Sequence, residues 1–191
     1  EDARAGALKP VYRPSRPWNL GDSPIPRFDL LNPAKYNRIT VQTSRGCPWK
    51  CDFCASSILI APRYQTKPVA KVVEEIRCIK SFWPRPFIEF ADDNTFVHKG
   101  YSKELMRALI PEGIRFFTET DISFAEDAEL IALAHDAGCK QVLIGLESPN
   151  LTGLDGLELR SNWKLKQHDH YLRAIDRIQS AGITVNGCFI L

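Results

Sequence analysis

Three cysteines within eight residues are the strongest chemical feature of the sequence. They stand in the segment Gly46-Cys47-Pro48-Trp49-Lys50-Cys51-Asp52-Phe53-Cys54, a C-x3-C-x2-C spacing. Three thiolates on one loop can hold three corners of a 4Fe–4S cube, because thiolates are the usual ligands of this cluster. The fourth iron then has no protein ligand from the loop. The spacing therefore predicts an iron–sulfur site with one open coordination position for a substrate or cofactor.

Two other interpretations of the three cysteines stay open, a zinc site with a distant fourth ligand and a chance cluster. Structural zinc sites usually come as paired C-x2-C half-sites, and the sequence has no second pair. His168 and His170 could complete a zinc site, but their place at the start of an expected helix favours solvated surface. Six cysteines, three of them isolated, favour a metal site in a reducing compartment over a disulfide framework, and we expect a cytoplasmic protein.

The elements that must position these cysteines follow from the hydrophobic pattern. We expect strands at residues 39–43, 87–91, 114–118, 141–146 and 183–190, since these runs are short and mostly rich in Ile, Val, Phe and Thr. We expect helices at about 68–83, 102–110, 123–138 and 169–181. Pro68 should open the first helix at its N1 position. Ser123 and Glu126 should form a capping box, while Gly138 and Gly182 should end the third and fourth helices.

Strands that alternate with helices favour a parallel sheet with right-handed crossovers. Polar residues follow each complete strand: the three cysteines, then Asp92, Asp93 and Asn94, then Glu119, Thr120 and Asp121, then Glu147 and Ser148. A barrel places its site at the carboxyl ends of its strands, whereas a doubly wound sheet concentrates its site at one switch point. We therefore expect an α/β fold, a partial (β/α) barrel of about five strands that is truncated at the C-terminus.

Length and composition bound the function. The chain has 191 residues, and residues 1–38 hold six of its 13 prolines. We expect residues 1–38 to be a linker or connector from a missing upstream domain, and residues 39–191 to be an incomplete core domain. The net charge of +2 gives no support for a nucleic-acid partner. No apolar run approaches the roughly 18 residues of a membrane span, and no nucleophile–base pair identifies a catalytic residue.

The cysteine motif resembles the signature of the radical SAM superfamily, including the aromatic residue Phe53 just before the third cysteine. The similarity covers residues 39 to 191. The segments TSRGCPWKCDFC, FADDNTF and AGCKQVLIGLES together look most like the branch with a cobalamin-binding domain before the radical SAM core. That branch includes methyltransferases and ring- or chain-remodelling enzymes. The proline-rich lead-in is similar to the connector between those two domains.

The resemblance implies that Cys47, Cys51 and Cys54 bind a 4Fe–4S cluster whose fourth iron takes the amine and carboxylate of S-adenosylmethionine. An electron from an external donor then cleaves the sulfonium to methionine and a 5′-deoxyadenosyl radical, which abstracts hydrogen from the substrate. The cofactor supplies the difficult chemistry, and the protein orients it and excludes competing reactions. Cobalamin, bound through a domain that this sequence does not contain, is the further cofactor that the branch implies.

Four more residues receive roles from the resemblance. Phe53 would lie against the adenine, and Glu147 would accept hydrogen bonds from the ribose hydroxyls. Asp92 or Asp93 would contact the methionyl amine, because a carboxylate suits an ammonium donor. The segment Ala91-Asp92-Asp93-Asn94 replaces the glycines usual at that place, so which aspartate makes the contact stays open.

The sequence thus predicts a radical SAM enzyme that acts on a small-molecule or lipid-like substrate by cobalamin-dependent methylation or rearrangement. Methylthiolation of tRNA or protein is an alternative, which extra cluster cysteines upstream would favour and which the weak basicity does not support. A non-catalytic iron–sulfur or zinc module is the other alternative. An electron carrier would normally saturate its cluster with four protein ligands.

Overall fold

The structure, a computed structural model, describes residues 2–13, 18–56, 63–158 and 161–190. Its strands are β1 (Ile39–Val41), β2 (Ser44–Arg45), β3 (Gln65–Thr66), β4 (Phe87–Phe90), β5 (Arg115–Thr120), β6 (Cys139–Glu147) and β7 (Thr184–Phe189). Its α-helices are α1 (Val69–Phe82), α2 (Lys99–Leu109), α3 (Ala128–Asp136), α4 (Trp163–Gln167) and α5 (Tyr171–Ser180). None of these helices is both long and apolar enough to cross a membrane.

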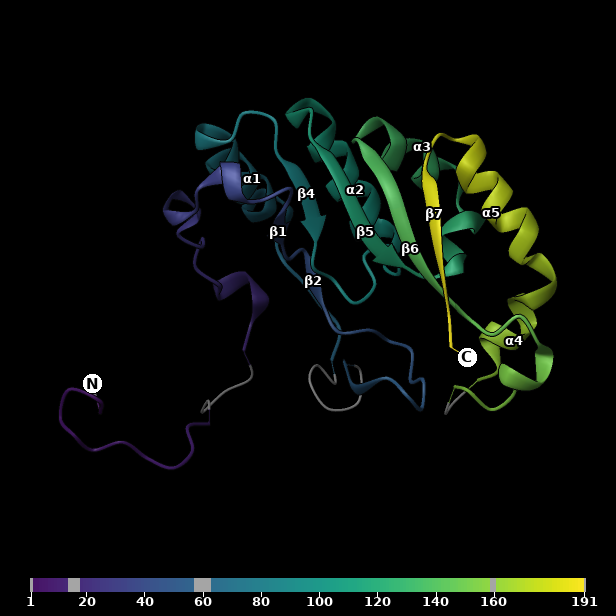
Figure 1. Ribbon diagram of the computed structural model, residues 1–191, viewed down its shortest axis with the longest axis horizontal. Coiled ribbons are helices and arrows are strands. Elements are labelled where there is room, and N and C mark those ends of the chain that lie inside the picture. Colours follow the sequence, from purple (N-terminus) through teal and green to yellow (C-terminus); the bar gives the residue numbers. More distant parts are fainter. Residues whose placement is uncertain (1, 14–17, 57–62, 159–160, 191) are drawn as a thin grey trace.

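Five strands form one parallel sheet in the order β1-β4-β5-β6-β7, so that each later strand is added on the same side. Helices α1, α2 and α3 lie behind this sheet in Figure 1, and α5 lies beside β7. A doubly wound sheet would reverse its strand order and carry helices on both faces. The one-directional order is that of a barrel, left open over the described residues. The predicted α/β partial barrel is confirmed.

Alternation along the central strands explains why the helices cover one face. Ile88, Phe90, Phe116, Val142 and Ile144 are fully buried or nearly so, and their neighbours in the chain point the other way. Each such side chain stabilises the fold by about 1.5–3 kcal/mol when it leaves water. The opposite face is left free to carry polar groups near the ends of the strands.

Helix α1 closes that core through one face. Its residues Val72, Val73, Ile76 and Ile79 are buried at three- and four-residue spacing, as the sequence pattern predicts. Pro68 is the N-cap rather than the N1 residue, because its ψ of 132° is extended and not helical. The predicted position of Pro68 is therefore wrong by one residue.

The capping box predicted at Ser123 is also wrong. Asp121 accepts a hydrogen bond from the Ser123 amide, so this stretch is a 3₁₀ turn, Ile122–Glu126. Helix α3 begins later, because Asp127 accepts the Leu130 amide and acts as its N-cap. The free backbone amides of these two successive turns are thus capped by the carboxylates of Asp121 and Asp127, and not by the Ser123 hydroxyl.

The remaining helix ends differ less from prediction. Gly138 (φ 96°) and Gly182 (φ 81°) follow α3 and α5 in the left-handed conformation, as predicted. Helix α2 begins at Lys99, three residues before its predicted start, because the His98 ring accepts the Tyr101 amide there. Helix α4 lies in a stretch for which no helix is predicted.

The N-terminal segment packs on the sheet domain from about residue 20 onward. Leu20 and Phe28 are buried, and the Lys71 amine donates to the Gly21 carbonyl at 2.6 Å. These contacts attach the segment to α1 and β3. The assignment of residues 1–38 to a connector and of residues 39–191 to a core domain stays a prediction.

Candidate functional site

The cysteine loop begins at the carboxyl end of β1 and is closed at its base. Ser44 and Arg45 in β2 pair in antiparallel fashion with Thr66 and Gln65 in β3. The three cysteines lie between these two short strands, as an excursion from the connection between β1 and α1. The sheet thus fixes where the loop leaves and returns, while its cysteines extend beyond the strand ends.

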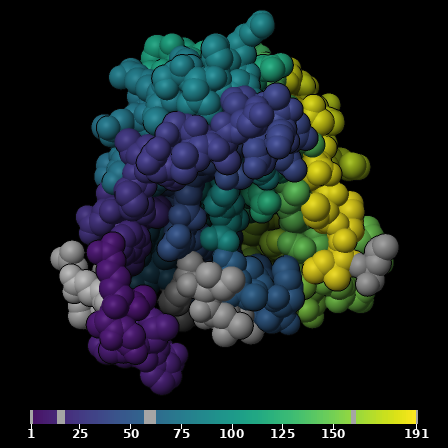
Figure 2. Space-filling model, turned by 60° about the vertical axis from the view of Figure 1, so that its left-hand side comes forward, coloured from purple at the N-terminus to yellow at the C-terminus, as the bar shows by residue number. Residues whose placement is uncertain are grey.

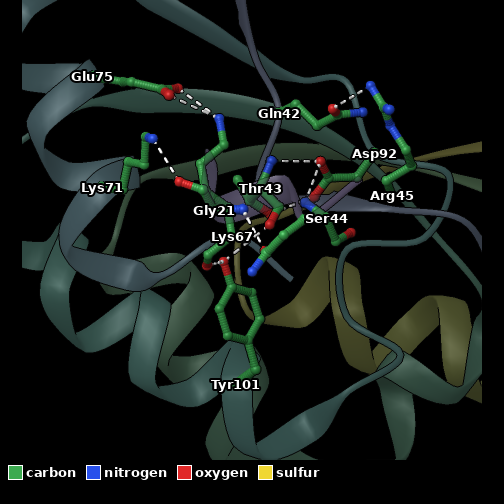
Figure 3. A network of polar contacts seen from close by, with 11 residues as sticks. Gly21, Gln42, Thr43, Ser44, Arg45, Lys67, Lys71, Glu75, Asp92 and Tyr101 are labelled. Atoms are coloured by element: carbon green, nitrogen blue, oxygen red, sulfur yellow. Dashed lines mark hydrogen bonds and ion pairs between the residues drawn. The ribbon is translucent and has the colours of Figure 1, made fainter. Parts of the chain in front are cut away.

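Two aspartates after β4 hold the first half of this loop, and we call them the Asp brace. Asp92 is 3% exposed and accepts the backbone amides of Thr43 and Ser44 at 2.7 and 2.9 Å. It also accepts the hydroxyls of Thr43 and Thr95. Figure 3 shows the Asp92 carboxylate pointing at the backbone of Thr43 and Ser44. Burial raises the pKa of Asp92, and these hydrogen bonds oppose the rise.

Asp93, the other member of the Asp brace, is exposed and reaches the loop closer to the cysteines. Its carboxylate accepts the Gly46 amide at 2.7 Å, and Gly46 has a φ of 82°. A left-handed residue just before Cys47 turns the chain outward at little cost only because it is glycine. The Asp brace therefore fixes the backbone that leads into the first cysteine.

The second half of the loop is held by residues 155–158 and 161–164, which we call the rear clamp. The Asp52 amide donates to the Leu157 carbonyl at 3.0 Å, and Cys51 forms an isolated antiparallel bridge with Glu158. The Trp49 ring stacks on Trp163, with ring centres 5.1 Å apart and planes 8° from parallel. The rear clamp comes from the long connection after β6, so distant parts of the chain meet at the cysteines.

A cavity of about 310 Å³ opens between the cysteine loop and the ends of β4, β5 and β6. Its lining includes Cys47, Cys51, Cys54, Phe53, Asp93, Glu119, Asp121 and Glu147, together with Trp49, Asn94, Gly145 and Lys164. Figure 2 shows a hollow on this side of the molecule, between the N-terminal half in purple to blue and the C-terminal strand in yellow. Six of the seven residues predicted to bind a metal or cofactor thus face one cavity, and Asp92 lies beneath the loop instead.

Glu147 occupies a strained position at the end of β6. Among the described residues, it is the only one other than glycine with a positive φ, 66°. The pairing register between β6 and β7 shifts between Gly145 and Glu147, and this bulge turns the carboxylate toward the cavity. Strain of this kind costs about 1–3 kcal/mol and collects at functional sites.

Lys164 compensates that strain with an ion pair. Its amine, on a side chain only 8% exposed, pairs with the Glu147 carboxylate and donates to the Gly145 carbonyl at 3.1 Å. A Cβ at residue 145 would collide with the Glu147 carboxylate and lie 3.4 Å from the Lys164 amine. A side chain at residue 145 would therefore displace the Glu147–Lys164 pair from its present position.

Sequence reasoning missed Lys164 and Trp49 as site residues, and it named Asn94 among the polar residues at the strand ends without giving it a role. Lys164 stands in a stretch without clear periodicity, and Trp49 has only its place inside the cysteine motif to mark it. An asparagine directly after a strand is also typical of turn capping, so its residue type does not indicate a role in the site. The place of Asn94 after β4 marks it as a site residue, but only the structure shows that its amide contacts Thr120 and Asp121 at the end of β5.

His168 and His170 do not line the cavity. His170 is exposed and its ring contacts Arg173, while the His168 ring contacts the Pro149 carbonyl at 2.9 Å. The described residues contain no group of three or more His, Cys, Asp or Glu side chains arranged to hold a metal ion. A 4Fe–4S cube differs from a single ion, because each thiolate bonds a different iron and the three sulfurs need not meet at one point.

The electrostatics of the cavity suit a cationic metal cluster. Burial raises the pKa of the Cys47 thiol, and it raises that of Cys51 to about 11 against the opposing charge of Lys164. Iron supplies the positive charge that holds buried thiols as thiolates. Burial also raises the pKa of Glu119, and the carboxylates of Glu89 and Asp93 add to the effect. The donor set and the shared cavity therefore fit a 4Fe–4S cluster with a ligand beside it.

Comparison with known proteins also points to an iron–sulfur enzyme of this kind. The sequence model of the Radical SAM superfamily matches residues 41–191. The chain is 26% identical to bacteriochlorophyllide d C-12(1)-methyltransferase of Chlorobaculum tepidum, over 99% of this chain and 42% of that protein. It is 29% identical to hopanoid C-3 methylase of Methylococcus capsulatus, over 86% of this chain and 32% of that protein. The chain thus spans less than half the length of these relatives.

A solved structure shares the fold at low identity. The cobalamin-dependent S-adenosylmethionine radical enzyme OxsB, with aqua-cobalamin and S-adenosylmethionine bound, superimposes with a TM-score of 0.77 and 19% identity. The match covers 99% of this chain and 31% of that protein. The five-stranded partial barrel described above is therefore a known arrangement.

Proposed function

The chain belongs to the radical SAM superfamily, and we propose that it binds a 4Fe–4S cluster and S-adenosylmethionine and serves a cobalamin-dependent methylation. When bound, the cluster and cofactor supply an electron-driven cleavage that yields methionine and, after hydrogen abstraction from the substrate, 5′-deoxyadenosine. The observation that carries the proposal is the cavity in which three thiols meet the polar ends of β4, β5 and β6.

The cysteines and their neighbours divide the work of binding. Cys47, Cys51 and Cys54 hold three irons and leave the fourth to the methionyl group of the cofactor. The Asp93 carboxylate accepts hydrogen bonds from the methionyl ammonium. Each of its oxygens accepts one bond from the loop, from Gly46 or Ser56, but it lines the cavity, whereas Asp92 is buried under the loop backbone. A charged hydrogen bond of this kind is about twice as strong as a neutral one.

The nucleoside half of the cofactor falls to two other residues. Glu147 accepts the ribose hydroxyls, and the ion pair with the Lys164 amine holds its carboxylate in place at the cavity. Phe53, about half exposed at the rim, covers the adenine. Trp49 closes another wall of the cavity with an apolar ring, which limits the access of water to the reacting atoms.

The substrate that we propose is a small or lipid-like organic molecule. Relatives of this chain are named for methylation of a bacteriochlorophyllide and of a hopanoid, a pigment and a lipid. A structural neighbour is described as cobalamin-dependent, which supports cobalamin as the second cofactor. Methylthiolation and a non-catalytic metal module are less favoured, because neither is the activity for which these relatives are named.

The first experiment tests cofactor cleavage. The protein is reconstituted with iron and sulfide without oxygen, reduced with dithionite and given S-adenosylmethionine, and 5′-deoxyadenosine is measured by mass spectrometry. We expect 5′-deoxyadenosine from the wild type, its loss in Cys51→Ala, and its retention in the matched control Cys78→Ala, since Cys78 lies on α1 away from the cavity. A wild-type protein that binds zinc and no iron contradicts the proposal.

A second experiment tests cobalamin. A longer chain that includes the upstream cobalamin-binding domain predicted above is reconstituted, and aquacobalamin is titrated into it while its absorption spectrum is recorded. Methyl-labelled S-adenosylmethionine is then added under reduction. Transfer of label to the corrinoid supports methylation, whereas cofactor cleavage that proceeds with no effect of cobalamin favours a hydrogen-abstraction or rearrangement reaction.

A further inference from the structure

We propose that Asn94 sets the reduction potential of the cluster by donating a hydrogen bond from its side-chain amide to the sulfur of Cys47. This inference rests on the proposed function, because it requires a cluster on Cys47. It assigns to Asn94 a positioning and tuning role that is separate from binding S-adenosylmethionine.

The geometry places one amide nitrogen between an acid and a thiol. The Nδ2 atom of Asn94 donates to Asp121 Oδ2 at 2.7 Å and to Cys47 Sγ at 3.8 Å. An amide nitrogen carries two hydrogens, so both bonds can exist at once. Asn94 is 3% exposed, which keeps water from competing for either hydrogen.

The other end of the amide fixes which atom faces the sulfur. Asn94 Oδ1 accepts the Thr120 hydroxyl at 3.2 Å, and a carboxylate such as Asp121 can only accept. A flipped amide would set its oxygen against the Asp121 oxygen. The nitrogen must therefore face Asp121, and with it Cys47.

Asp121 is itself held in place, which makes the orientation of Asn94 durable. Its Oδ1 accepts the Ser123 amide at 2.8 Å, and its Oδ2 also accepts the Trp49 indole at 2.7 Å. Trp49 belongs to the cysteine loop and stacks on the rear clamp. The donor to Cys47 is thus oriented by the same contacts that order the loop.

A donor at a ligand sulfur acts on the two oxidation states unequally. The oxidised cluster takes up one electron from the reductant, and no proton or group moves. Reduction increases the negative charge on the sulfurs, so the hydrogen bond stabilises the reduced state more and raises the potential. Removing the donor should make reduction about tenfold less favourable, which is about 59 mV for a one-electron couple.

The test is a redox titration of the reconstituted protein followed by electron paramagnetic resonance. We expect Asn94→Leu, which is of similar size and has no donor, to shift the midpoint potential by about 59 mV to the negative side. Asn94→Ser is the second variant if the leucine hinders cluster uptake. Thr120→Val is the matched control, because it alters the same buried cluster of side chains and leaves both hydrogens of Nδ2 in place. Its shift should be under a third as large.

A measurement on the wild type needs no substitution. Protein labelled with ¹⁵N in asparagine side chains should show a nitrogen coupled to the reduced cluster, since Asn94 is the only asparagine that lines the described cavity. An unchanged potential in a cluster-loaded Asn94 variant, or the absence of the ¹⁵N coupling, would overturn the inference alone. Failure of the wild type to take up a four-iron cluster would overturn the proposed function and this inference with it.

Discussion

The cysteine loop is held on both sides, by the Asp brace before Cys47 and by the rear clamp after it. The main part of the Asp brace is the buried carboxylate of Asp92, which accepts two backbone amides and two hydroxyls. The clamp is a partly exposed aromatic stack with a few backbone contacts, contributed by the connection after β6. The Asp brace should therefore open only when the core unfolds, while the rear clamp can open locally.

This difference suits the chemistry proposed for the loop. A cluster with an open iron needs its first ligand rigid, so that the donor from Asn94 stays within reach. Entry of iron, sulfide and cofactor needs part of the loop to move. Because the brace is tied to β4 and the clamp to a surface connection, we expect the loop to open at Trp49–Cys54 and to stay closed at Thr43–Gly46.

Loss of the buried brace should have the largest effect. Asp92→Ala leaves two backbone amides without acceptors in a buried place, at about 1–3 kcal/mol each, so we expect a loss of about 4 kcal/mol in the free energy of unfolding. Urea unfolding followed by circular dichroism measures it. The matched control is Asp93→Ala, which removes the exposed neighbour with its two hydrogen bonds, from the Gly46 amide and the Ser56 hydroxyl, and should cost about 1–2 kcal/mol. Equal losses in the two variants would show that burial does not distinguish the two acids.

Opening the clamp should have a smaller and local effect. Trp163→Ala removes the stack on Trp49, and such aromatic pairs are worth about 0.5–1.5 kcal/mol beyond the area they bury. If the loop loses about 1 kcal/mol of local stability, amide hydrogen exchange of residues 49–54 should become about fivefold faster. The urea midpoint of the whole domain should change little. Trp163→Phe keeps a ring and should restore most of the protection. A large drop in global stability with unchanged loop exchange would place Trp163 in the core instead.

The sequence predicts the brace region better than the clamp, and the reason is physical. The strands and the residues after them follow from local patterns, so Cys47, Asp93 and Glu147 can be expected at one edge of the sheet. Asp92 and Asp93 differ in which carboxylate lies under the loop. Because the two residues are identical and adjacent, the sequence does not indicate which one that is.

The rear clamp depends on contacts between segments that are distant in the sequence and have no common hydrophobic periodicity. Nothing in the pattern around Trp163 and Lys164 indicates a ring that stacks on the cysteine loop or an amine that meets Glu147. The bulge before Glu147 and its positive φ arise from that meeting, not from a propensity of glutamate. The predicted starts of α3 and α2 differ from the observed ones, Ala128 and Lys99, for a similar reason, since capping depends on which of several nearby polar groups reaches the amide.

The smallest expected effect concerns charge within the cavity. Burial raises the pKa of Glu119 above its ordinary 4.5, and the nearby carboxylates of Glu89 and Asp93 raise it further. Between the ordinary and the raised pKa the folded state binds more protons than the unfolded state, so Glu119 lowers stability as pH rises through that window. We expect Glu119→Gln to raise the melting temperature slightly at pH 7.

The pH dependence separates this charge effect from packing. Below pH 4.5 the side chain is protonated in both states, so the advantage of Glu119→Gln should shrink toward zero as pH falls through the raised pKa. Melting curves of both proteins between pH 4 and 8 measure the difference. If Glu119→Gln raises the melting temperature equally at every pH, the glutamine amide stabilises the fold through hydrogen bonds. The acids on this side of the cavity then do not repel one another. A gain in melting temperature that depends on pH would instead indicate that the cavity by itself carries negative charge at neutral pH. A bound cationic cofactor would reduce the repulsion between these carboxylates.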